Sequence, residues 1–576
     1  MALSPDVEQR ARRLALQNAV EHGGDPRPGP IVSRLLAQDP ALRAQSGEVA
    51  NRVQAIVADV ARLSASDQRT ALDQLGGAEV APARAASAPG ELPPLPDAVP
   101  GKVVLRMAPF PSGALHIGNG RMIFVNDAYR TLYRGRLLLV FDDTIGSEEK
   151  RVDAEMIEGI REDLELAGVG VDETVYKSDR VPLFYPWARR VIDQGAAYVC
   201  RCPALTLRQN RAEGRACAER GQTVEEAASE WRRMLQGGYA PGEAVLRLKT
   251  DLHDPDPAFR DRVLFRISDL DHPRVGHRYR VWPMLEFSWA VDDVELGITH
   301  VLRGKDLVIE DRMEEEIWRI LGLKGPRFVH WGILRVKEAK ISKSKSYAEV
   351  KSGLYDGWAD PRTWSLRSLD RRGILPETVR RFTLSFGLSL ADIEVPAETL
   401  YAENRQLIDA VTARRAFVEE PVQLHVSGYP SDLAEVELAN HPDRTDLGTR
   451  RATAGPDLWL ARADLVARLG TEVRLKELVN VQLPEALPPG PRPTIEAAFT
   501  GRENKRIPRL QWVGAVGATE VDMVGLEGEH HLGLGEAALR TALPRDHLQF
   551  ERVGFVRVEA NWVSGTAPVR VCYGHP

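Results

Sequence analysis

The feature that most constrains this chain is a pair of short apolar runs separated by a loop and a helix-like stretch. The first run is Val103–Leu105, and a loop rich in proline and glycine follows it. A helical pattern then extends from Ile117 to Tyr133, and the second run is Leu137–Phe141. Strand, helix and strand in this order are typical of a parallel sheet, because parallel strands need a long crossover between them. The sequence therefore predicts an α/β domain beginning near residue 101.

Length and charge narrow the class of protein. At roughly 150 residues per domain, the 576 residues suggest several domains. The net charge is −6, from 76 basic and 82 acidic residues. This balance argues against a protein that coats DNA, but a local basic face can still bind RNA.

The same sequence predicts a reduced, cytoplasmic protein that does not enter membranes. No apolar run approaches the roughly 18 residues that span a bilayer, and the first residues lack the apolar core of a signal peptide. The 4 cysteines are too few for a disulfide framework in so long a chain.

Changes in residue pattern divide the chain into successive parts. Residues 76–100 are rich in alanine, proline and glycine and lack periodicity, so we expect a linker there. The other expected parts are a helical domain at 1–75, the α/β domain at 101–202 and 281–346, an insertion at 203–280, a helical region at 347–415 and short β-strands at 416–576. The predicted fold class is a multi-domain α/β plus all-β protein.

A first motif lies between the predicted strand and helix, in the string RMAPFPSGALHIGN at residues 106–119. His116 and Asn119 are three residues apart at the start of the helix, so they face the same way. Free N–H groups at a helix start attract phosphate, and Gly118 lets a flat ligand approach the backbone. Either side chain alone is more typical of a helix cap, whereas the whole string indicates a nucleotide site.

A second motif alternates lysine with small hydroxyl residues. It reads Lys340-Ile-Ser342-Lys343-Ser344. Such a loop can close over a polyphosphate and place ammonium groups next to developing negative charge. Taken alone, it is more typical of a solvated basic loop.

Together, the two motifs resemble the HIGH and KMSKS signatures of class I aminoacyl-tRNA synthetases. The chain further resembles archaeal-type glutamyl-tRNA synthetases, in Phe141–Thr144, in the block from Ala290 to Asp306 and in stretches of residues 404–555. The resemblance implies a Rossmann-like catalytic domain in two halves, with residues 203–280 binding the tRNA acceptor end. It also implies that the region 416–576 forms β-barrels that bind the anticodon.

What the resemblance implies chemically is a two-step ligation that uses ATP and Mg²⁺. Glutamate attacks the α-phosphate of ATP, and the terminal adenosine of tRNA then attacks the adenylate. His116 and Asn119 would hold phosphate oxygens, and Lys343 with Lys340 would stabilise the departing pyrophosphate. The implied ATP-binding residues are Pro109, His116, Gly118, Ser342, Lys343 and Ser344.

The implied amino-acid pocket contains Arg106, Ala108, Asp142 and Arg303. A guanidinium at Arg106 can bind a γ-carboxylate through two hydrogen bonds, and Asp142 would hold the α-ammonium group. The implied partners are L-glutamate and tRNA(Glu), with no DNA and no membrane. Whether tRNA(Gln) is charged as well stays open at this point.

Several positions depart from the family pattern. Asn119 replaces the second histidine of HIGH, and Val140 and Ile145 replace an arginine and a carboxylate of the strand that meets the amino acid. Leu285 stands where many relatives have a tyrosine. These departures keep two alternatives open, a glutaminyl-tRNA synthetase and a catalytically silent tRNA-binding paralogue.

Cys200, Cys202 and Cys217 resemble part of a zinc knuckle that some relatives carry. A structural zinc site needs four ligands, and the next histidine, His253, is distant in sequence. We therefore expect no bound metal, and zinc in particular is not expected.

Overall fold

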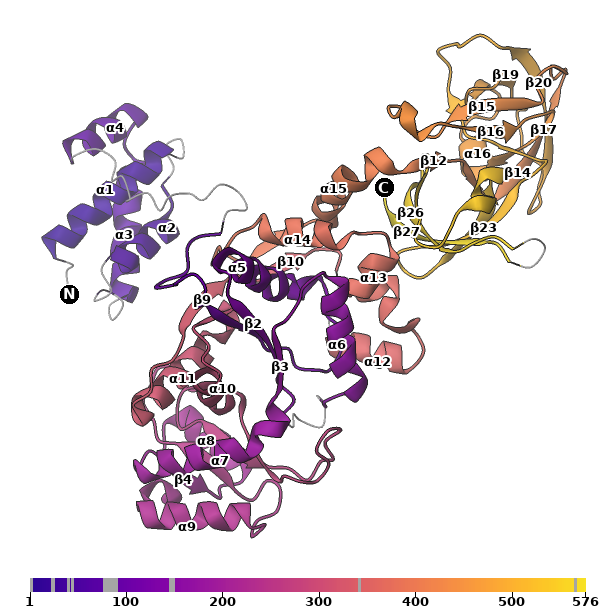
Figure 1. Cartoon of the computed structure of the whole chain (residues 1–576). Helices are drawn as coiled ribbons and strands as arrows, with labels where there is room; N and C mark the ends of the chain where they lie inside the picture. The colour runs from indigo at the N-terminus through magenta and orange to yellow at the C-terminus, as the bar shows by residue number, and fades with distance from the viewer. Residues whose placement is uncertain are drawn as a thin grey trace. The chain divides into compact units, whose positions relative to one another are not determined.

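The computed structural model describes residues 4–21, 26–38, 42, 46–75, 92–144, 151–339, 343–563 and 567–576. The chain splits into two compact units near residue 88, and Figure 1 shows the elements of each. Within these described ranges, no helix is both long enough and apolar enough to cross a membrane.

The first unit is a set of four helices around one apolar core. Their bounds are α1 (Pro5–Glu21), α2 (Pro28–Gln38), α3 (Ser46–Ala61) and α4 (Ala65–Gln74). Leu14, Leu35, Val53 and Val60 are buried in that core, as their helical spacing predicts. Of the expected linker at 76–100, residues 76–91 lie outside the described part of the chain.

The second unit begins with the parallel sheet that the sequence predicts. Its strands β1 (Val104–Met107), β2 (Arg136–Phe141) and β3 (Glu173–Tyr176) run parallel in that order. A further parallel pair, β8 (His300–Gly304) and β9 (Arg327–Trp331), continues the arrangement. It joins β1 through Thr299, whose N–H donates to the Val104 carbonyl at 2.9 Å. The Rossmann-like prediction is therefore confirmed.

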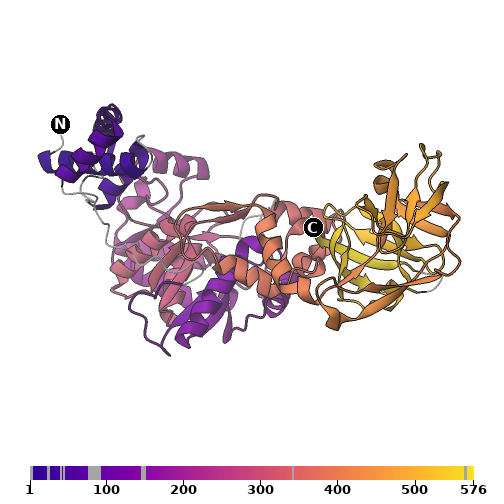
Figure 2. The same ribbon diagram turned by 90° about the horizontal axis from the view of Figure 1, so that it is seen from above.

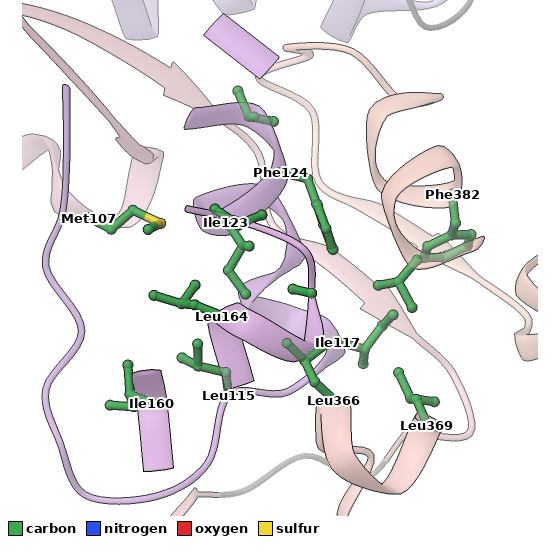
Figure 3. Packing of buried hydrophobic residues seen from close by; sticks show 14 of the residues in the cluster. Met107, Leu115, Ile117, Ile123, Phe124, Ile160, Leu164, Leu366, Leu369 and Phe382 are labelled. Carbon is green, nitrogen blue, oxygen red and sulfur yellow. The ribbon is translucent and has the colours of Figure 1, made fainter. Parts of the chain in front are cut away.

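Buried side chains lock this sheet to its helices. Ile123 and Phe124 lie just before α5 (Asn126–Tyr133), and Ile160 and Leu164 come from α6 (Ala154–Leu166). Figure 3 shows them packed beside Met107 of β1. Residue 135 has to be glycine, because a side-chain carbon there would collide with the Val103 carbonyl oxygen.

The insertion forms an antiparallel four-stranded sheet of its own. It contains β4 (Ala197–Cys200), β5 (Val245–Leu248), β6 (Val263–Ile267) and β7 (Val281–Pro283), with α7 (Lys177–Asp193), α8 (Ala204–Glu213) and α9 (Val224–Leu235). Phe184, Trp231 and Phe265 are buried between these elements. The sheet starts before residue 203 and ends after residue 280, so it is wider than the expected insertion. The sequence pattern does not show where the inserted sheet begins and ends, because β4 and β7 are short apolar runs like those of the parallel sheet.

The remaining elements of the catalytic part follow in order. They are α10 (Leu285–Glu295), α11 (Val308–Leu321), β10 (Leu334–Val336), α12 (Lys343–Lys351), α13 (Leu366–Arg371), α14 (Pro376–Leu384), β11 (Ile393–Val395) and α15 (Ala397–Ile408). Pro376 begins α14 at a first-turn position where its missing N–H costs nothing.

The C-terminal part consists of barrel-like sheets, as the fold-class prediction states. One seven-stranded sheet contains β12 (Ala413–Arg415), β13 (Phe417–Glu419), β23 (Thr519–Val524), β24 (His530–Gly535), β25 (His547–Phe550), β26 (Gly554–Ala560) and β27 (Val569–His575). The other contains β14 (Pro421–Ser427), β17 (Asp457–Ala461), β18 (Glu472–Leu475), β19 (Asn480–Gln482), β20 (Thr494–Gly501), β21 (Arg509–Leu510) and β22 (Val513–Gly514). The hairpin β15 (Glu435–Ala439) and β16 (Thr449–Thr453) and the short α16 (Arg462–Val466) complete it.

The end of the chain is anchored where these sheets meet the helical region. The imidazole of His575 stacks on Tyr401 of α15, with ring centroids 5.2 Å apart. Its Nε2 accepts from the Asn404 amide nitrogen at 3.0 Å, so the ring proton sits on Nδ1, next to the Pro576 carbonyl. The C-terminus lies beside α15 in Figure 1 and at the same junction in Figure 2.

Because this imidazole is buried, we expect the stability of the C-terminal strand to depend on pH. Burial lowers the pKa of His575 from 6.5 to about 4, so the unfolded chain binds a proton more readily. The contribution of neutral His575 to the free energy of unfolding is complete above pH 6.5. This contribution falls as the pH drops toward 4, by about 2 kcal/mol at pH 5. Amide hydrogen exchange of β27 at pH 7.5 and 5 measures this loss. His575→Gln should show a smaller loss than wild type, and an equal loss would contradict the assignment.

Candidate active site

The first motif forms a cap at the edge of the parallel sheet. His116 precedes a 3-10 turn, Ile117–Asn119, and its Nδ1 accepts from the Gly118 N–H at 3.1 Å. The Asn119 side-chain oxygen in turn accepts from the His116 N–H at 3.1 Å. The structure thus brings the two residues together, and the capping alternative noted from the sequence also applies to them.

A cavity of about 310 Å³ lies beside this cap. One side of its lining comes from the motif, with Ala108, Gly118 and Asn119. Another comes from β1 and β8, with Arg106 and Arg303. The rest of the lining is Arg121, Met122, Trp289, Leu302, Gly304, Asp306, Leu307, Trp331, Ile333 and Leu334. Residues of the cap and three arginines, Arg106, Arg121 and Arg303, therefore line one space.

Arg106 is held in a buried ion pair. Its Nε and Nη2 donate to the two carboxylate oxygens of Asp293, at 2.5 and 2.8 Å. Arg106 is 5% exposed and Asp293 is fully buried. Burial alone would lower the pKa of Arg106, but the Asp293 carboxylate raises it above its usual value. The guanidinium therefore stays charged and fixed in direction.

Arg303 is held in the same manner from α11. Its Nε donates to Asp311 at 2.7 Å, and its Nη2 contacts Asp311 and lies 2.9 Å from Glu314. Its Nη1 is buried and has no hydrogen-bond partner in the described structure. In both arginines, Nε and Nη2 bind carboxylates, whereas Nη1 binds none in the described structure.

Trp289 of α10 lies at the centre of three cations. The guanidinium groups of Arg106 and Arg303 are 4.7 and 5.1 Å from its ring, and the Lys177 ammonium is 4.9 Å away. Lys177 is fully buried, donates to Ser288 at 2.7 Å and pairs with Asp142 at 3.4 Å. Burial lowers the pKa of Lys177. The face of an aromatic ring attracts cations, so Trp289 helps to hold these charges together.

The predicted site residues fall into distinct places. Arg106, Ala108, Gly118, Asn119 and Arg303 line the cavity. His116 and Pro109 are sequence neighbours of that lining, whereas Asp142 pairs with Lys177, which contacts the ring of Trp289. Lys340 and Ser342 lie outside the described residues, and for Lys343 and Ser344 the structure describes only the backbone at the start of α12.

The departures from the family pattern do not all reach the cavity. Val140 is fully buried and packs with Leu138 and Val301 in the sheet core. Leu285 is not one of the residues that line the cavity in the described structure. Ile145 lies outside the described residues.

Sequence analysis missed Trp289 and Lys177 as parts of the site. A signal for Trp289 does exist, because Leu285, Trp289 and Asp293 follow one another at a spacing of four and so share a helix face. Lys177 begins α7, far from either motif, and no local pattern marks it. Arg121 was also missed; it lines the cavity, is 3% exposed and donates to the Gly332 carbonyl at 2.7 Å.

The cysteines of the insertion meet a fourth possible ligand. Ligand atoms of Cys200, Cys202, Cys217 and Glu219 all lie within 4.8 Å of one another. The sulfurs of Cys200 and Cys217 are 3.7 Å apart, close to the roughly 3.8 Å between two sulfurs bound to one tetrahedral zinc at about 2.3 Å. We expected no zinc because the sequence showed no fourth ligand, and in the structure Glu219 offers a carboxylate oxygen that could be the fourth.

Family comparisons agree with this geometry. Residues 102–409 match the model of the class I tRNA synthetase (E and Q) catalytic domain, and residues 412–489 match the anti-codon binding domain of the same group. A glutamate–tRNA ligase of Pyrococcus abyssi is 39% identical over 96% of this chain and 97% of its own length. That of Methanopyrus kandleri is 38% identical over 99% of both chains.

A solved glutamate-tRNA synthetase from Elizabethkingia anophelis also aligns with this chain. Its TM-score is 0.39 at 21% identity, over 54% of this chain and 71% of that one.

The buried pair makes a prediction about stability. Asp293→Asn should lower the free energy of unfolding by about 3–5 kcal/mol, because it leaves the Arg106 charge buried without its partner. Asp269 is the matched control, since Arg280 donates to it in the same two-pronged way while the carboxylate is half exposed. Asp269→Asn should leave the free energy of unfolding nearly unchanged, because an exposed ion pair contributes little. Urea unfolding followed by tryptophan fluorescence measures both, and equal losses would contradict the assignment.

Proposed function

Since this chain belongs to the class I tRNA synthetases for glutamate and glutamine, we propose that it is a glutamate–tRNA ligase. It activates L-glutamate with ATP and transfers it to the 3′-terminal adenosine of tRNA(Glu). The observation that carries this proposal is the single cavity lined both by the cap at Gly118 and Asn119 and by the guanidinium groups of Arg106 and Arg303. A nucleotide phosphate and an acidic amino acid could meet there.

The residues predicted from the two motifs bind ATP and position its charged groups. His116 and Asn119 hold phosphate oxygens of ATP, whose Mg²⁺ arrives with it as part of the substrate. Pro109 and Gly118 shape the loop that admits the nucleotide. Lys343 and Lys340, with Ser342 and Ser344, stabilise the pyrophosphate as it leaves. No covalent enzyme intermediate is needed, so the rate comes from orientation and charge stabilisation.

The glutamate side is built from the paired arginines. Because Asp293 takes up Nε and Nη2 of Arg106, we assign Nη1 of Arg106 to the substrate γ-carboxylate. Arg303 supplies a second positive charge, and Ala108 leaves room beside it. Asp142, which pairs with Lys177, holds the α-ammonium group. A neutral glutamine side chain would offer Nη1 of Arg106 no charged acceptor, which favours glutamate.

The other regions serve the tRNA. The sheets of the region 416–576 bind the anticodon, and the insertion binds the acceptor end. We propose that tRNA(Gln) is charged with glutamate as well, and that the enzyme works in the cytoplasm. Splayed bases can be read in loops between strands.

Aminoacylation tests this proposal directly. The purified chain is given ATP, Mg²⁺, total archaeal tRNA and either labelled glutamate or labelled glutamine, and the charged isoacceptors are identified. We expect charging with glutamate on tRNA(Glu) and tRNA(Gln). Charging with glutamine alone would replace the proposal by a glutaminyl-tRNA synthetase. Tight tRNA binding without any charging would favour the silent paralogue.

We also propose that Cys200, Cys202, Cys217 and Glu219 hold a structural zinc ion. Three thiolates and a carboxylate are ligands that zinc accepts in closed tetrahedral sites. The buried guanidinium of Arg247 lies 3.8 Å from the Cys200 sulfur and would balance the negative charge of this ligand set. The ion would tie the end of β4 to the 3-10 turn at Ala218–Gly221.

Zinc content checks the metal proposal without an activity assay. The wild-type chain should retain about one zinc ion per chain after dialysis, measured by mass spectrometry of the element. Cys202→Ser and Glu219→Gln should lower this content. Cys572→Ser is the matched control, because Cys572 is a free, buried cysteine in β27, and it should keep the ion. Zinc-free wild type, or equal loss in the control, would refute the site.

A further inference from the structure

The cap that carries His116 is held by a distant segment of the chain. The Ile117 N–H donates to the Trp364 carbonyl at 3.1 Å, and the Leu366 N–H donates to the Leu115 carbonyl at 2.8 Å. His116 and Ser365 form an isolated antiparallel bridge between these two bonds. Figure 3 shows the side chain of Ile117 beside Leu366 and Leu369, so apolar contacts reinforce the backbone bonds.

Trp364 adopts a conformation that needs outside support. Its φ is 51°, in the left-handed region, and its bulky side chain is buried. For a bulky residue this conformation is strained, and it persists only where neighbours enforce it. The carbonyl that receives the Ile117 N–H therefore depends on what packs against Trp364.

Arg372 supplies that support from the other end of α13. Its guanidinium lies 4.9 Å from the centre of the Trp364 ring. Its Nη2 donates to the Tyr401 hydroxyl at 2.7 Å and to the Gly574 carbonyl at 2.8 Å. Arg372 is 1% exposed, and in the described part of the chain no carboxylate forms an ion pair with it. A buried charge without a counter-ion depends heavily on each acceptor it has.

Gly574 belongs to β27, so the acceptor comes from the C-terminal sheet. The same junction contains Asn404, whose amide nitrogen reaches both the Gly373 carbonyl and the His575 ring at 3.0 Å. Through these contacts the position of β27 affects the position of Arg372. Arg372 in turn supports the conformation of Trp364, whose carbonyl accepts from the Ile117 N–H next to His116.

We propose that Arg372 is a positioning residue. It keeps the cap at His116–Asn119 aligned only while β27 of the C-terminal sheet is packed against it. The proposal rests on the function proposed above. If β27 moves away, Arg372 loses a carbonyl acceptor and its contact with Trp364 weakens. Trp364 can then relax toward an ordinary conformation, and the cap loses its fixed hydrogen bonds.

Arg371 offers a matched control for Arg372. Its guanidinium also reaches the C-terminal sheet, through an ion pair with Glu559 of β26. In contrast to its neighbour, Arg371 has no ring contact with Trp364 among the described cation–aromatic contacts. Replacing Arg371 therefore perturbs the junction while it leaves the path to the cap intact.

The experiment compares aminoacylation by Arg372→Met and Arg371→Met. Arg372→Met should lower kcat about tenfold or more, with KM for tRNA changed by no more than about twofold, because it misplaces a transition-state contact. Arg371→Met should keep kcat within about threefold of wild type. Arg372→Lys should recover part of kcat, because it restores a cation and a donor.

A second pair of variants tests the junction from the sheet side. In Gly574→Ala, the new carbon would lie too close to the Arg372 carbonyl oxygen. Gly533→Ala is the control, because its carbon would meet the Val418 carbonyl oxygen in the same sheet, on strands that do not contain residue 574. The proposal predicts a kcat loss in the first variant and none in the second, at equal folded fractions.

Three results would overturn the proposal. They are equal kcat losses in Arg372→Met and Arg371→Met, a change in KM for tRNA alone, or full kcat in Gly574→Ala. Failure of the wild-type chain to charge any tRNA would instead refute the proposed function, so the two failures can be told apart.

Discussion

The buried ion pair between Arg106 and Asp293 is the interaction on which the rest of the catalytic part depends. It ties β1 to α10 across 187 positions of the sequence, and the whole insertion lies between the two residues. Removing either ion would leave the other buried without a partner, so the pair stabilises the contact between the two halves of the Rossmann-like domain. The guanidinium group of Arg106 also lies over the ring of Trp289, which Arg303 and Lys177 approach as well.

This arrangement explains how a pocket for an anion can be assembled from charges that mostly neutralise one another. Asp311 and Glu314 direct Arg303 as Asp293 directs Arg106. The carboxylates bind Nε and Nη2 of each guanidinium group, which leaves Nη1 for other contacts. A fixed direction matters more than net charge here, since a guanidinium that does not have to reorient stabilises a bound anion at lower cost.

Sequence reasoning reached those features that depend on local periodicity. The apolar runs Val103–Leu105 and Leu137–Phe141 predicted two parallel strands, because a loop and a helix-like stretch join them. His116 and Asn119 could be placed together because they are three positions apart. Lys177 could not be placed beside Trp289, because their meeting depends on how α7 and α10 pack. Glu219 was missed as a neighbour of the cysteines for the same reason, since a folded turn and no spacing rule brings it there.

The support of the active-site cap shows a similar limit. Nothing in the sequence around Trp364 indicates a positive φ, a conformation that sequence reasoning reserves for glycine and asparagine. Arg372 packs against Trp364 and is itself held by Tyr401 and Gly574, and this packing stabilises the positive φ of Trp364. Strain of this kind is expected where function needs a fixed geometry.

Binding of two stable mimics of the reaction intermediate tests the central claim most directly. Non-hydrolysable analogues of glutamyl-adenylate and glutaminyl-adenylate differ only at the γ-position, which the account places against Arg106. Isothermal titration calorimetry should find the glutamyl analogue bound at least about tenfold more tightly, a difference of about 1.4 kcal/mol. Equal affinities, or tighter binding of the glutaminyl analogue, would contradict the claim that this cavity selects glutamate through its fixed guanidinium groups.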